Sequence, residues 1–141
     1  DANSCIGCRT CAVACMDANR REFGLGFRKV KTFATGSFPN PAMYHVSYIP
    51  NEAQTSPKTG KVHNCAYCTS ITALGEQQPC VAACPMRAIE FGDLDELKAR
   101  REVSQVASTF PALNLVGPIR PDQLYLIKGC MTDPDFDEVV M

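Results

Sequence analysis

Eight of the nine cysteines fall into two runs whose spacing suits metal–sulfur chemistry. The first run has the spacing C-x2-C-x2-C-x3-C and comprises Cys5, Cys8, Cys11 and Cys15. The second run comprises Cys65, Cys68, Cys80 and Cys84, with eleven residues between its middle two thiols and Pro85 after the last. Three thiols on one tight loop can reach three corners of a cube of iron and sulfide. The spacing therefore indicates [4Fe–4S] clusters.

The fourth thiol of each run is predicted to serve the cluster of the other run. Cys15 lies beyond the first loop, on what should be the first turn of a helix, and this placement directs it away from the first cluster. In chains with two such clusters, the fourth cysteine of the run does ligate the other one. Pro85 fits the pattern because it fixes φ and ends the turn that carries Cys84. We assign the first cluster to Cys5, Cys8, Cys11 and Cys84, and the second to Cys65, Cys68, Cys80 and Cys15.

Two other uses of these cysteines stay open at this stage. A zinc ribbon also has paired C-x2-C knuckles, but it arranges four ligands as two separated pairs, and His63 would be a spare ligand here. A disulfide scaffold is usually shorter, and a bridge between thiols three residues apart is strained. The ninth thiol, Cys130, matches no motif, and we expect it to be an ordinary thiol rather than a ligand.

Length and charge narrow the class of protein. The chain has 141 residues, a net charge of −1 and 45% hydrophobic residues, which suits one domain or a little more. It has no basic run that would indicate nucleic acid and no apolar stretch of the ~20 residues that a membrane helix needs. Thiolates must reach iron in a reducing compartment, so we expect cluster assembly in the cytoplasm. Because Asp1 lies only four residues before Cys5, we also expect a missing N-terminal strand.

The elements that must position these thiols are predicted from periodicity and breakers. A short helix is expected at Cys11 to Arg20, and strands at Phe27 to Phe33 (an edge strand), Met43 to Ile49, Ala88 to Phe91 and Gln123 to Lys128. Thr35 to Pro41 should be a turn, Asn51 to Lys61 a loop, Thr69 to Pro79 a surface excursion and Phe110 to Pro121 extended. Asp93 is predicted to cap a helix that runs to about Val103, with Leu94 and Leu97 facing inward. The acidic tail from Asp133 to Glu138 is expected to be a solvated end or a partner contact.

Three stretches resemble a known family. They are SCIGCRTCAVACMDAN, the segment from HNCAYC through PCVAACP, and MRAIEFGDLDEL directly after the last cysteines. Together they are similar to the iron–sulfur subunit of anaerobic dimethyl sulfoxide reductase, within the electron-transfer subunits of molybdopterin oxidoreductases. The resemblance implies an α+β fold, with a two-[4Fe–4S] ferredoxin-like domain at residues 1–93 and a C-terminal extension at residues 94–141.

The sequence departs from that family in its middle. The family carries four cysteine motifs and four clusters, whereas this chain matches only the first and the last motif. The middle module, with up to two more clusters, would belong near Tyr48 to Asn51. Either the protein is a naturally reduced two-cluster version, or the full protein has an inserted module that this sequence lacks; we favour the second interpretation.

The function implied by the resemblance is an electron relay. Its partners would be a molybdopterin (Mo-bisMGD) catalytic subunit and a quinone-linked membrane anchor, at the periphery of the cytoplasmic membrane. The chain itself should not be catalytic, because all-cysteine ligation leaves no iron open to substrate, and His45 and His63 are isolated. Arg9 and Arg87 are candidates for raising a cluster potential, against the alternative of surface salt bridges. A free, diffusible ferredoxin is the alternative function.

Overall fold

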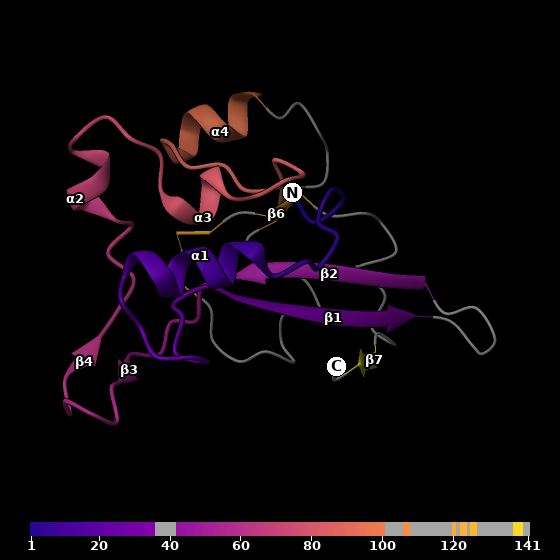
Figure 1. Ribbon diagram of the computed structural model, residues 1–141. Helices are drawn as coiled ribbons and strands as arrows, with labels where there is room; N and C mark the ends of the chain where they lie inside the picture. Colours follow the sequence, from indigo (N-terminus) through magenta and orange to yellow (C-terminus); the bar gives the residue numbers. More distant parts are fainter. Residues whose placement is uncertain are drawn as a thin grey trace.

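A computed structural model shows short helices packed on one side of a small antiparallel sheet (Figure 1). The structure describes residues 1–35, 42–100, 106–107, 120, 122–123, 125–126 and 137–139. The mixture of short helices and small sheets is compatible with the predicted α+β class. None of the helices within these ranges is long and apolar enough to cross a membrane.

Helix α1 (Thr10–Ala18) carries two of the first four thiols. Residues four apart share one face of a helix, and here that face buries Cys11 and Cys15, each 6% exposed. The helix ends where the backbone N–H and the side chain of Asn19 both donate to the carbonyl of Cys15, at 3.3 and 2.8 Å. The predicted helix is thus confirmed, with its end moved from Arg20 to Ala18.

The main sheet has the strand order β2-β1-β7. Strand β1 (Lys29–Thr35) pairs antiparallel with β2 (Ala42–Tyr48) on one side and with β7 (Asp137–Val139) on the other. The prediction that the first strand lies at an edge is therefore wrong. Thr32 and Phe33 are 4% and 0% exposed, and successive residues point to opposite faces, so both faces of β1 are covered. That double burial explains the imperfect alternation.

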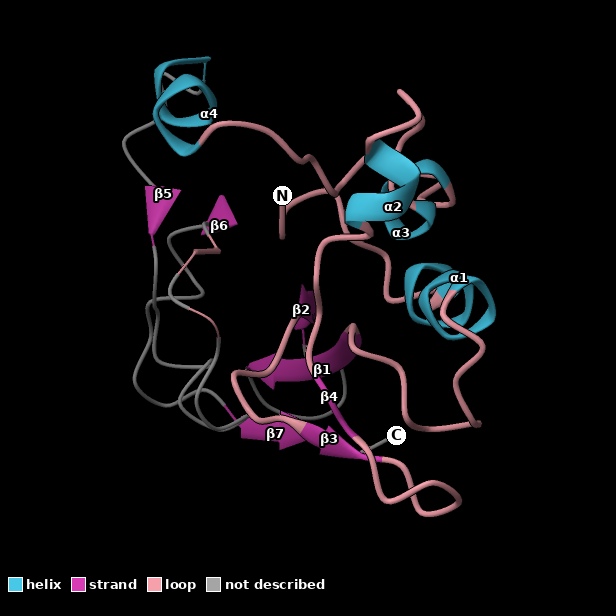
Figure 2. Ribbon diagram, turned by 90° about the vertical axis from the view of Figure 1, so that its left-hand side faces the viewer, coloured by secondary structure: helices cyan, strands magenta, loops and turns pink. Residues whose placement is uncertain are grey.

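Smaller elements connect the sheet to the second cysteine run. The segment predicted as a plain loop contains β3 (Gln54–Thr55), which pairs with β4 (Val62–His63). Helices α2 (Thr69–Thr72) and α3 (Pro79–Ala82) follow, and Figure 2 shows them beside α1, on the same side of the sheet. Leu74, between them, is 79% exposed, which agrees with the predicted surface excursion.

Ala88 to Phe91 does not form the predicted strand. The backbone N–H of Ala88 donates to the Cys84 Sγ at 3.3 Å, and its carbonyl accepts from the amino group of Asp1 at 2.5 Å. These backbone groups therefore serve the thiol and the N-terminus instead of a strand ladder. This local use of backbone groups was not visible in the hydrophobic pattern.

The C-terminal part begins with α4 (Leu94–Arg100), capped as predicted. The Asp93 Oδ1 accepts from the backbone N–H of Asp95 at 2.9 Å and of Glu96 at 3.2 Å. Strand β5 (Val106–Ala107) pairs with β6 (Tyr125–Leu126), which lies within the strand predicted at Gln123 to Lys128; Gln123 itself is not part of β6. The tail is not simply solvated, since the backbone of β7 pairs with β1. Cys130, the turn at 36–41, residues 101–105 and nearly all of the segment predicted as extended lie outside the described residues.

Candidate metal centre

All eight cysteines of the two runs line one cavity of about 430 Å³ between the helices and the β1–β2 sheet. None of the eight forms a disulfide. The sheet contributes Val30, Val46 and Ser47 to the wall, and α4 contributes Leu94 and Leu97. A set of thiols gathered around a largely apolar cavity is a donor set for a metal–sulfur group, whereas a disulfide scaffold would bridge them.

Burial makes four of these thiols reluctant to ionise without a nearby cation. It is the main cause that raises the pKa of Cys5, Cys11, Cys65 and Cys68. A thiolate is costly in such surroundings, and coordination to iron removes that cost. The chemistry of the donor set therefore fits an iron–sulfur group.

Electrostatic contacts between the thiols divide them into two sets. Besides burial, the pKa of Cys5 is raised by the charges of Cys84 and Cys8, and that of Cys11 by Cys5 and Cys80. In the same way, Cys15 acts on Cys65, while Cys80, Cys15 and Cys65 act on Cys68. Cys84 therefore lies beside the first loop and Cys15 beside the second. The two sets adjoin where Cys11 approaches Cys80.

The two loops that carry the thiols share a left-handed residue at the same position. Gly7 has φ +70° and Tyr67 has φ +54°, each two residues after the first cysteine of its loop. Their backbone N–H groups face Cys5 and Cys65, and each lowers the pKa that burial raises. The next left-handed residue differs: Arg9 (φ +62°) comes after Cys8, whereas Cys68 (φ +53°) directly follows Tyr67. The alternation in the first loop turns N–H groups inward, which is a recurring cradle for anionic iron–sulfur centres.

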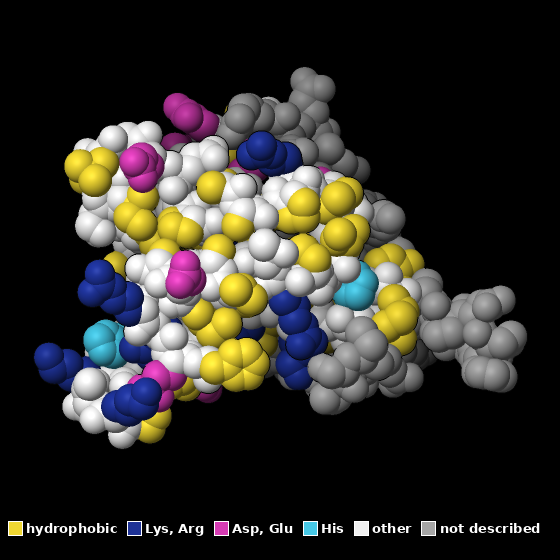
Figure 3. All heavy atoms as spheres, viewed as in Figure 1, with side chains coloured by type: hydrophobic (Ala, Val, Ile, Leu, Met, Phe, Trp, Pro, Cys, Tyr) yellow, Lys and Arg dark blue, Asp and Glu magenta, His cyan; other side chains and the backbone are white. Residues whose placement is uncertain are grey.

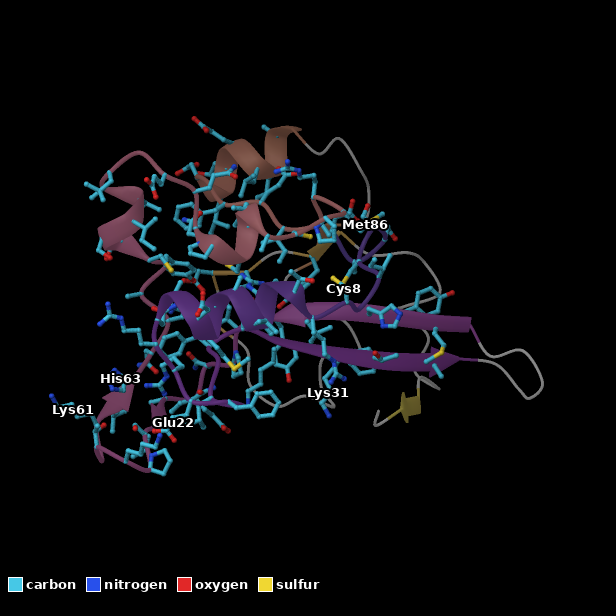
Figure 4. The ribbon with its side chains drawn as sticks, viewed as in Figure 1. Cys8, Glu22, Lys31, Lys61, His63 and Met86 are labelled. Carbon is cyan, nitrogen blue, oxygen red and sulfur yellow. The ribbon has the colours of Figure 1, made fainter. Side chains whose placement is uncertain are left out.

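Cys8 is the only exposed thiol of the eight, and its pKa is lowered. The main cause is the Thr10 hydroxyl, which donates to the Cys8 Sγ at 3.4 Å. Ile6 and Met86 are also exposed, at 53% and 45%, and Figure 4 shows Met86 near Cys8. The first set of thiols therefore reaches the surface at this edge.

Charged side chains gather next to that edge. A groove beside α1 is lined by Arg9, Arg28, Lys29 and Lys31. The space-filling view shows such a stripe of basic side chains bordered by hydrophobic ones (Figure 3). Arg9 and Arg87, the two arginines singled out from the sequence, are both exposed.

Sequence reasoning missed a cluster that holds the second loop. The Arg120 guanidinium donates to the Cys65 carbonyl at 2.5 Å, pairs with the Asp122 carboxylate at 3.0 Å and lies 4.6 Å from the centre of the Tyr67 ring. The Tyr67 hydroxyl also donates to Asp122. We call Arg120, Asp122 and Tyr67 the loop clamp. Arg120 and Asp122 are more than 50 residues from the loop, so no local pattern could have indicated them.

Among the described residues, no group of three or more His, Cys, Asp or Glu side chains is close enough to share a single metal ion.

Comparison with known proteins identifies the kind of subunit to which these features belong. No family model matches the chain. "Probable anaerobic dimethyl sulfoxide reductase chain YnfG" of Escherichia coli (strain K12) is 22% identical, covering 84% of this chain and 83% of the relative. The chain is therefore distantly similar, over most of its length, to chains of anaerobic dimethyl sulfoxide reductases.

Two further relatives match shorter stretches of this chain. "Thiosulfate reductase electron transfer subunit PhsB" of Salmonella typhi is 36% identical over 44% of this chain and 30% of the relative. "Formate dehydrogenase iron-sulfur subunit" of Haemophilus influenzae (strain ATCC 51907 / DSM 11121 / KW20 / Rd) is 33% identical over 37% of this chain and 17% of the relative. These names support electron transport and iron–sulfur clusters in a subunit of an oxidoreductase complex.

Proposed function

We propose that the chain relays single electrons through two [4Fe–4S] clusters. Cys5, Cys8, Cys11 and Cys84 would hold the first, and Cys65, Cys68, Cys80 and Cys15 the second. The observation that carries the proposal is the arrangement of eight thiols around one cavity in two sets, with Cys84 and Cys15 each placed beside the loop of the other run. When bound, such clusters accept and donate one electron at a time.

The chain's own residues would hold and shield these clusters. The backbone N–H groups at Gly7 and Tyr67 face the thiols, while Val46, Val81 and Ala88 are buried and line the same cavity. Keeping water away and directing N–H groups at sulfur are two ways in which proteins set a cluster potential. Full cysteine ligation leaves no iron for substrate, so the chain transfers electrons without catalysing the chemistry of its complex.

The names of the relatives suggest which subunits this chain would contact. The relatives named above are chains of reductase and dehydrogenase complexes, and one is named an electron transfer subunit. We propose a molybdopterin catalytic subunit on one side of the relay and a quinone-linked membrane anchor on the other. Cys8, at the exposed edge with Ile6 and Met86, is one end at which an electron could cross to a partner.

The alignment also bears on the middle of the chain. About 118 residues of this chain (84% of 141) align across 170 positions with the Escherichia coli relative, so about 50 positions of that relative have no counterpart here. A surplus of that size in the relative supports our proposal of a further module in the full protein, which the cysteine motifs would place near Tyr48 to Asn51. The mass of the native protein tests the point, since a value well above 15.4 kDa means that the full protein contains the module.

The decisive experiment is anaerobic purification of the chain from its host, followed by iron and sulfide analysis and EPR of the reduced sample. We expect EPR signals of interacting [4Fe–4S]⁺ centres, with about eight iron atoms per chain for the two clusters and up to about sixteen if the full protein carries the middle module. Zinc in place of iron would overturn the proposal.

Copurification separates the relay from the alternative of a free ferredoxin. A subunit should be recovered with a large molybdenum-containing polypeptide. Recovery of the fully loaded chain alone, at every salt concentration used, would instead support a diffusible carrier.

A further inference from the structure

One arginine lies inside the thiol-lined cavity. Arg28, directly before β1, is part of the cavity wall and is only partly exposed. Its Nη1 donates to the Ser47 Oγ at 3.1 Å, and that oxygen lies 3.5 Å from the Cys11 Sγ. The guanidinium is thus connected through one hydroxyl to a thiol of the first set.

The same guanidinium also has a buried N–H donor that no described residue accepts. The Nε of Arg28 is buried and has no hydrogen-bond partner among the described residues. Buried donors in native proteins are nearly always satisfied, and leaving one without an acceptor is unfavourable. Sulfur atoms of a cluster held in the cavity that Arg28 lines would be acceptors for this donor.

Arg28 also acts on both sets of thiols. It lines one cavity together with all eight thiols, and its charge lowers the pKa of Cys11 and of Cys65, which burial raises. Cys11 belongs to the first set and Cys65 to the second. Arg120, by contrast, acts on Cys65, and its contacts are with the second loop.

We propose that Arg28 lies between the two clusters and raises the reduction potential of both. This inference rests on the proposed two-cluster function. Each reduction adds one negative charge, and a fixed positive charge in surroundings of low dielectric constant stabilises that reduced form. The planar guanidinium presents donors in several directions, so one side chain can face two clusters at once, which a lysine ammonium cannot do as well.

The test is a redox titration followed by EPR on the full chain, purified anaerobically with its clusters. Arg28→Gln should lower both midpoint potentials, with the ratio of reduced to oxidised cluster at a fixed potential falling about tenfold, equivalent to 59 mV for a one-electron couple. Lys29→Gln is the matched control, because it removes the same charge from the next residue, which is exposed. It should move neither potential appreciably, because solvent screens an exposed charge.

The outcomes separate this inference from the proposed function. A wild-type chain without iron overturns the proposed function itself. Loaded variants in which Arg28→Gln shifts only one potential, or shifts no more than Lys29→Gln, overturn the role of Arg28 and leave the relay intact. If Arg28→Gln does not load clusters, Arg28→Lys replaces it. That variant should lower both potentials by a smaller amount, and unchanged values would contradict the proposal.

Discussion

The two cysteine loops share a left-handed position but differ in the residue that occupies it. In the first loop this residue is Gly7, for which a positive φ carries no steric penalty, and only Arg9 after the loop is strained. In Cys65–Cys68 the equivalent residue is Tyr67, and a bulky side chain at φ +54° is strained by about 1–2 kcal/mol, with Cys68 also at positive φ. The second loop therefore carries more backbone strain than the first and has more need of support.

The loop clamp provides that support from the C-terminal extension. Arg120 stacks on the Tyr67 ring and bonds to the Cys65 carbonyl, and Asp122 accepts from both Arg120 and the Tyr67 hydroxyl. Burial alone would raise the pKa of Asp122, but the hydrogen bonds from Tyr67 and Arg120 outweigh it and lower this pKa. The carboxylate is thus kept charged as the centre of the clamp. The less strained loop can be exposed, as Cys8 is, while the supported loop is tied to the body of the protein.

The largest expected effect tests whether the two loops exchange their fourth ligands. Cys84→Ser should destroy the cluster of the Gly7 loop, and Cys15→Ser the cluster of the Tyr67 loop, because each thiol lies beside the opposite loop. EPR spectra of the two reduced variants, together with iron content, would measure the loss. If each substitution damaged the cluster next to it in sequence, the crossed assignment would be wrong. Cys130→Ser is the control, with no change expected.

A second substitution removes the advantage of the first loop. Gly7→Ala would force alanine to φ +70° and place a Cβ within 2.7 Å of the His45 ring. Strain and overpacking together should lower the free energy of unfolding by about 2–4 kcal/mol and weaken the first cluster first. Gly75→Ala is the matched control, with φ +81° but nothing within 4 Å of the added Cβ, so strain alone applies. Thermal unfolding of the loaded proteins compares them, and equal losses would contradict a role for His45 packing.

A third substitution removes the support of the second loop. Arg120→Gln should destabilise the protein by about 1–2 kcal/mol, a modest value because its partner Asp122 is 37% exposed. The loss should appear as faster oxidative breakdown of the second cluster, with the first unaffected. Arg87→Gln, which removes an exposed charge near Cys84, serves as the control. Faster loss of the first cluster in Arg120→Gln would show that the clamp does not act locally.

The contrast between the loops also shows what the sequence could reveal. The thiol spacings, the helix behind the first loop and the Asp93 cap depend on residues within a few positions of one another, and local patterns predicted them. The central position of β1 depends on β7, about 100 residues away, and the clamp joins Cys65 to Arg120 across 55 residues. In the sequence, Arg28 is simply part of a predicted strand. Its hydrogen bond to Ser47, and through Ser47 the link to Cys11, appears only in the folded chain. Long-range pairing leaves no periodic signal, so these features could not be predicted.

The smallest expected effect comes from an element outside both loops. Asp93→Ala removes the carboxylate that accepts two backbone N–H groups at the start of α4, and should destabilise the protein by about 1 kcal/mol. Leu94 and Leu97 of this helix line the cavity that all eight thiols share, so the loss should be shared by both clusters. Asp93→Asn, which retains an acceptor, should recover most of the stability in chemical denaturation. A selective loss of one cluster in Asp93→Ala would mean that α4 supports that loop directly, and the difference between the loops would then extend beyond the clamp.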